Sequence, residues 1–482
     1  MIHNQTFESE IKSYQHRQSA AVKLIQIVNS LWFSNSIELI FFRNQLFDRP
    51  VSTVLNLHQQ SHDLAEPAIS IFETLRVAQT MQHLKLSPSR IDIGTLALEV
   101  RNQNIEEDQL LYFIKKELIS AQDHKSFEPK DVVLYGFGRI GRLLARELIS
   151  KNGAGKTLRL RAIVTRDDIN EITLAKRATL LRNDSIHGDF EGEVDIDLEQ
   201  EALIINGTTV KIISAKNPED IDYTIYGIDN ALIIDNTGAF RDEKELARHL
   251  TSKGATQVLL TAPGKGISNI VYGVNNEMID TANDKIFSAA SCTTNAISPI
   301  LDVIHQQFGV NHGHIETIHS YTNDQNLVDN MHKKSRRGRA AALNMVITET
   351  GAGTAIAKVL PTLAGKLTSN AIRVPVPNGS LAILNLQLTK PTTVEEINNT
   401  IRETALNGKL IEQIKYSNND ELVSSDIIGT TAASVLDAPA TIVDETGHNA
   451  VLYVWYDNEY GYTHQVMRLA RHIAGVRRYT YY

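Results

Sequence analysis

The chain has 482 residues, of which 42% are hydrophobic and 22% charged, as is usual for a globular protein with a substantial core. Its net charge of −8 argues against a general affinity for nucleic acid or for a membrane surface. A single cysteine excludes an internal disulfide and any metal site built from several thiolates, so no metal site is expected. At ~150 residues per domain, the length predicts about three domains. There is no apolar run of ~18 residues and no signal-peptide pattern, so we expect a cytoplasmic protein.

The first part of the chain, residues 1–127, is predicted to be an all-α extension. Apolar residues recur at helical spacing within 20–31 and again within 110–118. Pro50, Pro67 and Pro88 separate about four or five predicted helices. This stretch contains no glycine-rich loop, ligand cluster or repeat, so we expect it to serve assembly or regulation.

A boundary is expected at residues 126–129, and a different pattern follows it. Residues 131–135 form a strand-like apolar run, and a helical pattern begins directly after the next six residues. Glycines in such a turn permit a tight bend, close approach to a pyrophosphate and close packing of helix on strand. The order strand, GxGxxG, helix therefore predicts a dinucleotide-binding loop made of Gly136, Phe137, Gly138, Arg139, Ile140 and Gly141.

The residues after the second predicted strand, 158–164, bear on the choice of cofactor. An acidic residue is expected there to bind the ribose 2′-hydroxyl of NAD, but Arg166 occupies that place and Asp167 follows it. Arginine suits a 2′-phosphate, although Arg166 as a solvated loop charge is the alternative interpretation. The pattern favours NADP, or use of both cofactors, and leaves NAD open.

Further strands alternate with helices up to about residue 287. Asn206-Gly207 predicts a two-residue hairpin turn, and a helix is expected from about 242 to 253. An open α/β sheet binds its ligands at the carboxyl ends of its strands. Three residues at or just after the ends of the predicted strands 232–235 and 257–261 are therefore candidate cofactor contacts: Thr237, Gly238 and Thr261.

The only cysteine, Cys292, follows four small residues and precedes a helical pattern over 296–308. A sulfur in the first turn of a helix faces unpaired backbone N–H groups, which favour the thiolate. Pro299 leaves open whether this helix begins at the cysteine or only near Ser298. An inert, buried thiol is the alternative to a nucleophile.

Beyond this helix the pattern predicts a second domain with an antiparallel or mixed sheet, from strand-like runs at 315–321, 381–388 and 450–456. Helices are expected near 394–406 and 464–474, and the last is free to return to the first domain. His319, at the end of a strand, is a candidate base for the thiol. Hydroxyls and arginines in separate segments, among them the basic cluster 332–339, could converge on phosphate.

From about Asp131 to the C-terminus the chain resembles phosphorylating glyceraldehyde-3-phosphate dehydrogenase. Six motifs carry the resemblance, in the order in which that family has them: GFGRIGR (136–142), DSIHG (184–188), SCTTN (291–295), HSYTNDQ (319–325), RVP (373–375) and WYDNEYGY (455–462). Together with the boundaries above, the resemblance implies a Rossmann-type domain over 128–290, completed by 458–482, and a catalytic α+β domain over 291–457.

The resemblance also implies roles for individual residues. Cys292 would attack the aldehyde of glyceraldehyde 3-phosphate, and His319 would act as the base; phosphate would then cleave the thioester. Thr322 and Arg373 would bind the substrate phosphate, with Arg337 near both phosphates. The attacking phosphate would be bound by Ser291, Thr293, Thr350 and Gly351, and Asn458 would hold the nicotinamide amide. The family is usually a homotetramer, and such an enzyme serves glycolysis or gluconeogenesis.

Three features depart from the family. Arg166 matches the aspartate that selects NAD, and Asn330-Met331 replace a Leu-Pro pair of NAD-specific members. Both favour NADP or dual use. The extension has no counterpart in the family. Two other functions stay open: erythrose-4-phosphate dehydrogenase, in which water cleaves the thioester, and a non-catalytic redox sensor or scaffold.

Overall fold

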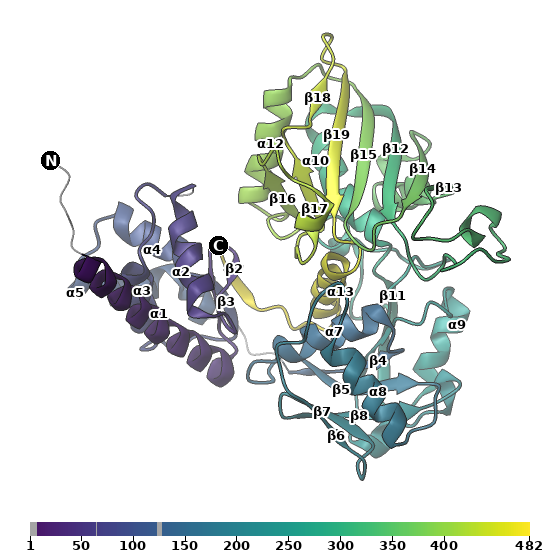
Figure 1. Ribbon diagram of the computed structural model, residues 1–482, viewed down its shortest axis with the longest axis horizontal. Helices are drawn as coiled ribbons and strands as arrows, with labels where there is room; N and C mark the ends of the chain where they lie inside the picture. The colour runs from purple at the N-terminus through teal and green to yellow at the C-terminus, as the bar shows by residue number, and fades with distance from the viewer. Residues whose placement is uncertain (1–6, 64, 123–127) are drawn as a thin grey trace. The chain divides into compact units, whose positions relative to one another are not determined.

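The computed structural model describes residues 7–63, 65–122 and 128–482, and its chain divides into two compact units (Figure 1). Unit 1 contains the chain up to residue 129, together with 150–159 and 475–482. Unit 2 contains residues 130–149 and 160–474. No helix among the described residues is long and apolar enough to cross a membrane.

Unit 1 contains the predicted helices, but the prediction that this part is all-α is wrong. Its helices pack around a small sheet with the strand order β2-β1-β3-β20, in which β1 pairs with β3 and β3 with β20 in parallel. The strands are too short to show an alternating pattern. The helices are α1 (Phe7–Asn35), α2 (Val51–Gln60), α3 (Ile71–Met81), α4 (Ile93–Asn102), α5 (Glu107–Glu117) and α6 (Ile119–Gln122); the strands are β1 (Glu38–Phe41), β2 (Asn44–Gln45), β3 (Ser89–Asp92) and β20 (Tyr479–Tyr481).

A buried carboxylate, Glu38 at the start of β1, joins three separate parts of the chain within unit 1. It forms ion pairs with Lys151 at 2.8 Å, Arg478 at 2.6 Å and Arg90 at 3.7 Å. Burial alone would raise the pKa of Glu38, but these three cations hold it well below its usual value. Residues 475–482 therefore belong with the extension, whereas the sequence assigned them to the dinucleotide-binding domain.

The first part of unit 2 is a largely parallel eight-stranded sheet, as predicted for a Rossmann-type domain. Its order is β11-β10-β9-β4-β5-β8-β7-β6, and the expected Asn206-Gly207 hairpin joins β7 to β8. The elements are β4 (Lys130–Tyr135), α7 (Arg139–Ser150), β5 (Leu158–Thr165), α8 (Glu171–Arg182), β6 (Val194–Asp197), β7 (Ala202–Ile205), β8 (Thr208–Ser214), β9 (Ala231–Asp235), α9 (Glu243–Ala247), β10 (Ala255–Leu260) and β11 (Ile286–Ser288).

The second part of unit 2 is a mixed sheet with the order β13-β14-β12-β15-β19-β17-β16, which confirms the predicted fold class. Helix α10 packs its apolar residues, among them Ile300 and Ile304, against strands β15 and β19 in one core. The elements are α10 (Cys292–Phe308), β12 (Val310–Ser320), β13 (Val346–Thr348), α11 (Ala352–Val359), β14 (Leu367–Val374), β15 (Ser380–Leu388), α12 (Val394–Leu406), β16 (Ile414–Ser417), β17 (Ser434–Asp437), β18 (Ile442–Val443), β19 (Asn449–Tyr456) and α13 (Tyr460–Ile473).

Candidate active site

Cys292 is the first residue of α10, directly after a sharp turn that follows β11. Ser291 caps the helix, because its hydroxyl oxygen accepts a hydrogen bond from the N–H of Thr294 at 3.0 Å. The helix continues through Pro299, so the alternative of a start near Ser298 is wrong. The thiol therefore lies among the unpaired N–H groups of a helix N-terminus.

The turn before the cysteine adopts an unusual backbone, since Ala290 has φ of +55°, a region that side chains with a Cβ rarely enter. Two side chains hold it. The amide of Asn295 donates to the carbonyl of Ala289 at 2.8 Å, and the hydroxyl of Tyr462 donates to the carbonyl of Ala290 at 2.8 Å. Both residues lie in the motifs quoted above, but the sequence did not reveal this positioning role.

His319 reaches the thiol from the end of β12, with 3.6 Å between its Nε2 and the Sγ of Cys292. In the parallel pairing of β12 with β14, His319 lies opposite Arg373, so the sheet register places the two side by side. Nδ1 of the imidazole is 2.7 Å from the carbonyl oxygen of Ser320. In the tautomer with the proton on Nδ1, directed at this oxygen, Nε2 is an acceptor facing the thiol. In the other tautomer Nδ1 accepts a hydrogen bond from Arg373, whose guanidinium can only donate, at 2.7 Å.

Burial and charge around this pair favour a neutral thiol and a neutral imidazole. Burial raises the pKa of the Cys292 thiol, while Arg373, the Thr293 hydroxyl and N–H groups at the helix start act in the opposite direction. Burial and then the guanidinium of Arg373, with one nitrogen 2.7 Å from Nδ1, lower the pKa of His319 to about 3. A neutral imidazole can accept the thiol proton as the sulfur attacks.

The residues that the sequence linked to phosphate binding come from several elements: Ser291 and Thr293 from the start of α10, Arg373 from β14, and Thr322, Arg337, Thr350 and Gly351 from the segments that follow β12 and β13. Thr293, beside the nucleophile, contacts the hydroxyl of Tyr456 at 3.1 Å. Arg337 donates to Thr348 at 2.9 Å and is paired with Asp324, and its charge acts on His319. Among the described residues no hydrogen bond joins Thr322, Thr350 or Gly351 to the Cys292–His319 pair.

The glycine-rich loop between β4 and α7 has the geometry that a pyrophosphate needs. A Cβ on Gly141 would come within 2.4 Å of Asn236, and Gly136 has φ of +100°. Around Gly138, by contrast, a Cβ would meet nothing within 4 Å, so space remains above the backbone. The loop thus fits a dinucleotide, with helix α7 beginning at Arg139.

A cavity of about 290 Å³ opens beside this loop, lined by Gly136, Phe137, Thr237 and the residues after β5. Arg166, Asp167 and Arg177 also line it. The carboxylate of Asp167 is paired with Arg177 at 2.5 Å. Arg166 is therefore accompanied by a second arginine, and the nearby carboxylate is already paired with a cation.

Two other expected cofactor residues also have defined partners. The hydroxyl of Thr261 donates to the backbone carbonyl of Asp235 at 3.1 Å, which holds the end of β10 to β9. Asn458 is buried and accepts a hydrogen bond from Ser380 at 2.8 Å. Its neighbour Glu459 pairs with Arg139 of the glycine-rich loop at 2.9 Å, and so the start of α13 contacts that loop.

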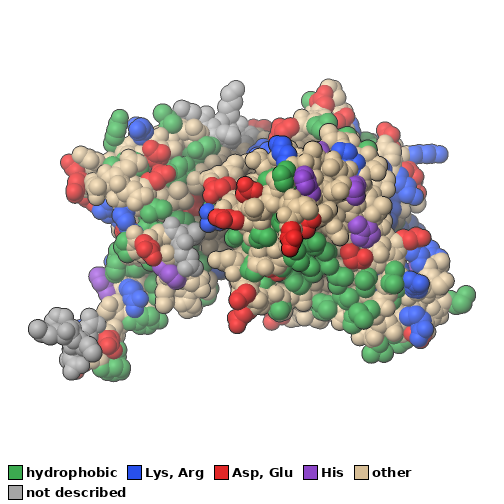
Figure 2. Space-filling model, turned by 90° about the horizontal axis from the view of Figure 1, so that it is seen from above, with side chains coloured by type: hydrophobic (Ala, Val, Ile, Leu, Met, Phe, Trp, Pro, Cys, Tyr) green, Lys and Arg blue, Asp and Glu red, His purple; other side chains and the backbone are tan. Residues whose placement is uncertain are grey.

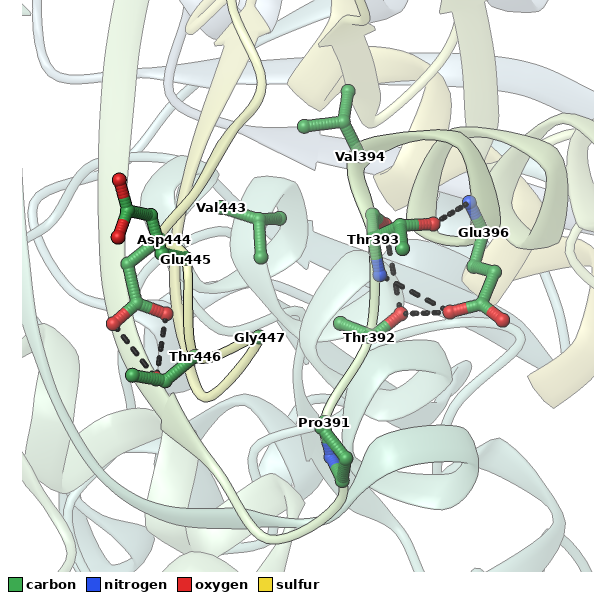
Figure 3. Close-up of a pocket in the computed structure, with 10 residues that line it drawn as sticks. All are labelled: Pro391, Thr392, Thr393, Val394, Glu396, Val443, Asp444, Glu445, Thr446 and Gly447. Atoms are coloured by element: carbon green, nitrogen blue, oxygen red, sulfur yellow. Dashed lines mark hydrogen bonds between the residues drawn. The ribbon is translucent and has the colours of Figure 1, made fainter.

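A hollow of about 440 Å³ lies elsewhere in unit 2, at the start of α12 and the turn before β19 (Figure 3). Its polar groups bond to one another: Thr393 and Glu396 form a capping box, and Thr446 donates to Asp444. None of the expected site residues lines it. We interpret it as a surface depression between the capped start of α12 and the turn before β19.

Comparison with known proteins agrees with this geometry. Residues 130–243 match the model of the glyceraldehyde 3-phosphate dehydrogenase NAD binding domain, and residues 291–458 match the C-terminal domain of the same family. The chain is 50% identical to a glyceraldehyde-3-phosphate dehydrogenase-like protein of Pseudomonas aeruginosa, over 94% of this chain and 98% of the relative. The chain belongs to the glyceraldehyde-3-phosphate dehydrogenase family.

Other members of this family differ in how much of the chain they match. Glyceraldehyde-3-phosphate dehydrogenase of Geobacillus stearothermophilus is 40% identical over 71% of this chain and 98% of its own length. That of Priestia megaterium is 39% identical over 70% of this chain and 96% of its own. The P. aeruginosa relative thus shares most of the N-terminal extension, which these two members lack.

The environment of His319 yields a testable prediction. Replacing Arg373 by Gln should raise the pKa of His319 above about 3, because a neighbouring cation that disfavours the imidazolium is removed. Burial remains, so the pKa should stay below 6.5. NMR titration of the imidazole, in a Cys292→Ser background that removes the thiol, measures this shift.

Arg337→Gln is the matched control, because Arg337 also lowers the pKa of His319 but ranks below Arg373. Its effect should have the same sign and be smaller. An unchanged or lower His319 pKa in the Arg373 variant would contradict an electrostatic origin of the shift.

Proposed function

We propose that the protein is a phosphorylating glyceraldehyde-3-phosphate dehydrogenase that acts through a thioester on Cys292. The observation that carries the proposal is the thiol at a helix N-terminus, 3.6 Å from the Nε2 of a neutral imidazole. The enzyme converts D-glyceraldehyde 3-phosphate and inorganic phosphate to 1,3-bisphosphoglycerate, in glycolysis or gluconeogenesis.

In the first step Sγ of Cys292 bonds to the aldehyde carbon and the thiol proton passes to Nε2 of His319. The imidazolium returns this proton to the carbonyl oxygen, which becomes the hydroxyl of a thiohemiacetal, and His319 is neutral again. N–H groups at the start of α10 are positioned to stabilise the developing negative charge on that oxygen. His319 then accepts the hydroxyl proton as the carbon is oxidised to the thioester.

A bound nicotinamide supplies the acceptor for the hydride that leaves this carbon. The chain's own residues complete the reaction. Arg373 and Thr322 hold the substrate phosphate, and Ser291, Thr293, Thr350 and Gly351 hold the attacking phosphate. The attacking phosphate cleaves the C–S bond and releases the acyl phosphate, and the Cys292 sulfur recovers its proton. Arg337 adds positive charge near both phosphates.

The proposed chemistry is tested by kinetics with aldehyde, nicotinamide cofactor and inorganic phosphate. Cys292→Ser should lower kcat by about 10³-fold or more, and His319→Gln by about 10²- to 10⁴-fold, because they remove the nucleophile and the base. Cofactor binding by Cys292→Ser should persist and serves as the control. Turnover that continues unchanged without phosphate would instead indicate hydrolysis of the thioester, and a near-native Cys292→Ser rate would favour a non-catalytic protein.

We further propose that the enzyme uses NADP, or both NADP and NAD. Arg166 lines the cavity beside the glycine-rich loop, where an acidic residue would select NAD. Arg177 supports the proposal in a second way. By pairing with Asp167, it prevents that carboxylate from repelling a 2′-phosphate or from binding the ribose hydroxyl instead.

Cofactor choice is tested by comparing kcat/KM for the two cofactors. Arg166→Asp should lower kcat/KM for NADP by about 10- to 100-fold and leave that for NAD equal or higher, because a charge-assisted contact to phosphate is lost. Arg177→Gln should act in the same direction with a smaller effect, since it frees Asp167.

Lys176→Asp is the matched control, because Lys176 is an exposed neighbour on α8 that is not among the residues lining the cavity. It changes the charge as much as Arg166→Asp does and should alter both cofactors equally. Equal losses for NADP and NAD in the Arg166 variant would refute a 2′-phosphate contact.

We also propose that the protein is a homo-oligomer, a tetramer as the family resemblance implies. Six large apolar residues are exposed within one 21-residue segment between β12 and the end of β13: Leu327, Val328, Met331, Leu343, Met345 and Ile347. Met331 is 94% exposed and Leu343 82%. Apolar side chains concentrated in this way mark a protein–protein interface.

Sedimentation velocity tests the assembly. The wild-type protein should have the mass of four chains, and Leu343→Lys should shift it towards smaller species because a charge is placed in the interface. Ile172→Lys, at an exposed apolar residue of α8, is the control and should not change the mass. A monomeric wild-type protein at micromolar concentration would overturn this proposal.

A further inference from the structure

The first turns of α1 extend beyond the core of unit 1. Every residue from Phe7 to Arg17 is exposed, and buried positions begin only at Ala20. In Figure 2 this part of the chain stands out as a narrow arm at lower left. His16 contacts Phe72 of α3, with 4.7 Å between the two ring centroids. Such a short helical stretch gains little stability by itself in water, so a further partner surface would stabilise it.

The arm continues the same apolar stripe that packs the rest of α1 into its core. Apolar residues recur along the helix at alternating spacings of four and three, interrupted once by Gln18: Phe7, Ile11, Tyr14, Gln18, Ala21, Ile25, Val28 and Trp32. Ala21, Val28 and Trp32 are fully buried. Phe7, Ile11 and Tyr14 are 74%, 40% and 45% exposed. This is a heptad seam whose first half is left exposed, apart from contacts of Tyr14 with Arg17 and Gln18 of the same helix.

We propose that the arm, residues 7–18, pairs antiparallel with the arm of a second copy of this chain. In that arrangement Ile11 packs against Tyr14 of the second copy, and Phe7 against its Gln18. Each of these two side-chain pairs occurs twice, because the contact has two-fold symmetry. A single polar residue at a seam position, here Gln18, is a known means of fixing the register of two helices.

The charges that flank the seam favour a second copy in this orientation. The arm begins acidic, with Glu8 and Glu10, and becomes basic at Lys12 and Arg17. Antiparallel pairing places Glu10 of each copy beside Arg17 of the other, which gives two ion pairs. Parallel pairing would instead place Glu10 beside the neutral Gln15. The antiparallel helix dipoles also attract each other.

The contact between two arms is too small to form a dimer by itself. The proposal therefore rests on the homo-oligomer proposed above, which would bring two arms together. Three apolar side chains per copy bury much less area than an independent dimer requires. Within one assembly, however, a second arm is present at a high effective concentration, and a weak contact then forms. The extension lies outside the two domains that match the family. The paired arms would add a second contact to the assembly that those domains form.

Amide hydrogen exchange of the full-length enzyme tests the proposal at residues 7–18 directly. Glu10→Arg and Arg17→Glu should each speed exchange there by about two- to fivefold, because like charges then meet across the pair. The double variant Glu10→Arg/Arg17→Glu should restore the wild-type rate. Co-expression of the two single variants should do so as well, because each then supplies the charge that the other lacks.

Glu8→Arg is the matched control, because it removes the same charge from the helix start but lies beside the neutral Gln15 of the second copy. Its exchange should stay close to wild type. The proposal is overturned if co-expressed single variants exchange as fast as either variant alone, or if Glu8→Arg acts as strongly as Glu10→Arg. An enzyme that is monomeric by sedimentation overturns the assembly instead, whereas an intact tetramer with unprotected arms overturns only the arm contact.

Discussion

The proposed chemistry depends most on the 3.6 Å contact between Sγ of Cys292 and Nε2 of His319, which two independent elements create. One is the turn between β11 and α10, where Ala290 adopts a positive φ and Asn295 and Tyr462 hold its carbonyls. The other is the parallel register of β12 and β14. Strain of about 1–3 kcal/mol at such a residue persists only where the surroundings enforce it.

The same register places a cation where it controls the protonation of the pair. Arg373 lies opposite His319 on the neighbouring strand and contacts its Nδ1. While the guanidinium stays there, it disfavours the imidazolium and favours a neutral acceptor beside the thiol. An anionic ligand that draws Arg373 away would make His319 more basic. In the proposed mechanism, binding of the substrate phosphate thus prepares the base for its two proton transfers.

The sequence predicted features that depend on neighbouring residues, and it missed contacts between segments that lie far apart in the chain. Local motifs were sufficient for the glycine-rich loop, for Cys292 at a helix start and for His319 at a strand end, because spacing along the chain determines each of them. Pairings between distant segments left no local signal. Only the structure therefore shows three such contacts: the pairing of β20 with β3, the ion pair of Arg177 with Asp167, and the hydrogen bond from Tyr462 to Ala290.

Contacts between distant segments also stabilise the extension, through the ion pairs of Glu38. Glu38 is 1% exposed, and its three cations come from β3, from the segment after α7 and from the last residues of the chain. Removing one partner of a buried ion pair costs about 3–5 kcal/mol, because a charge remains buried without compensation. Unit 1 therefore reaches its full stability only when the C-terminal strand has been added. Residues up to 129 are thus completed, within unit 1, by residues 150–159 and 475–482, so the extension does not form this compact unit from its own residues alone.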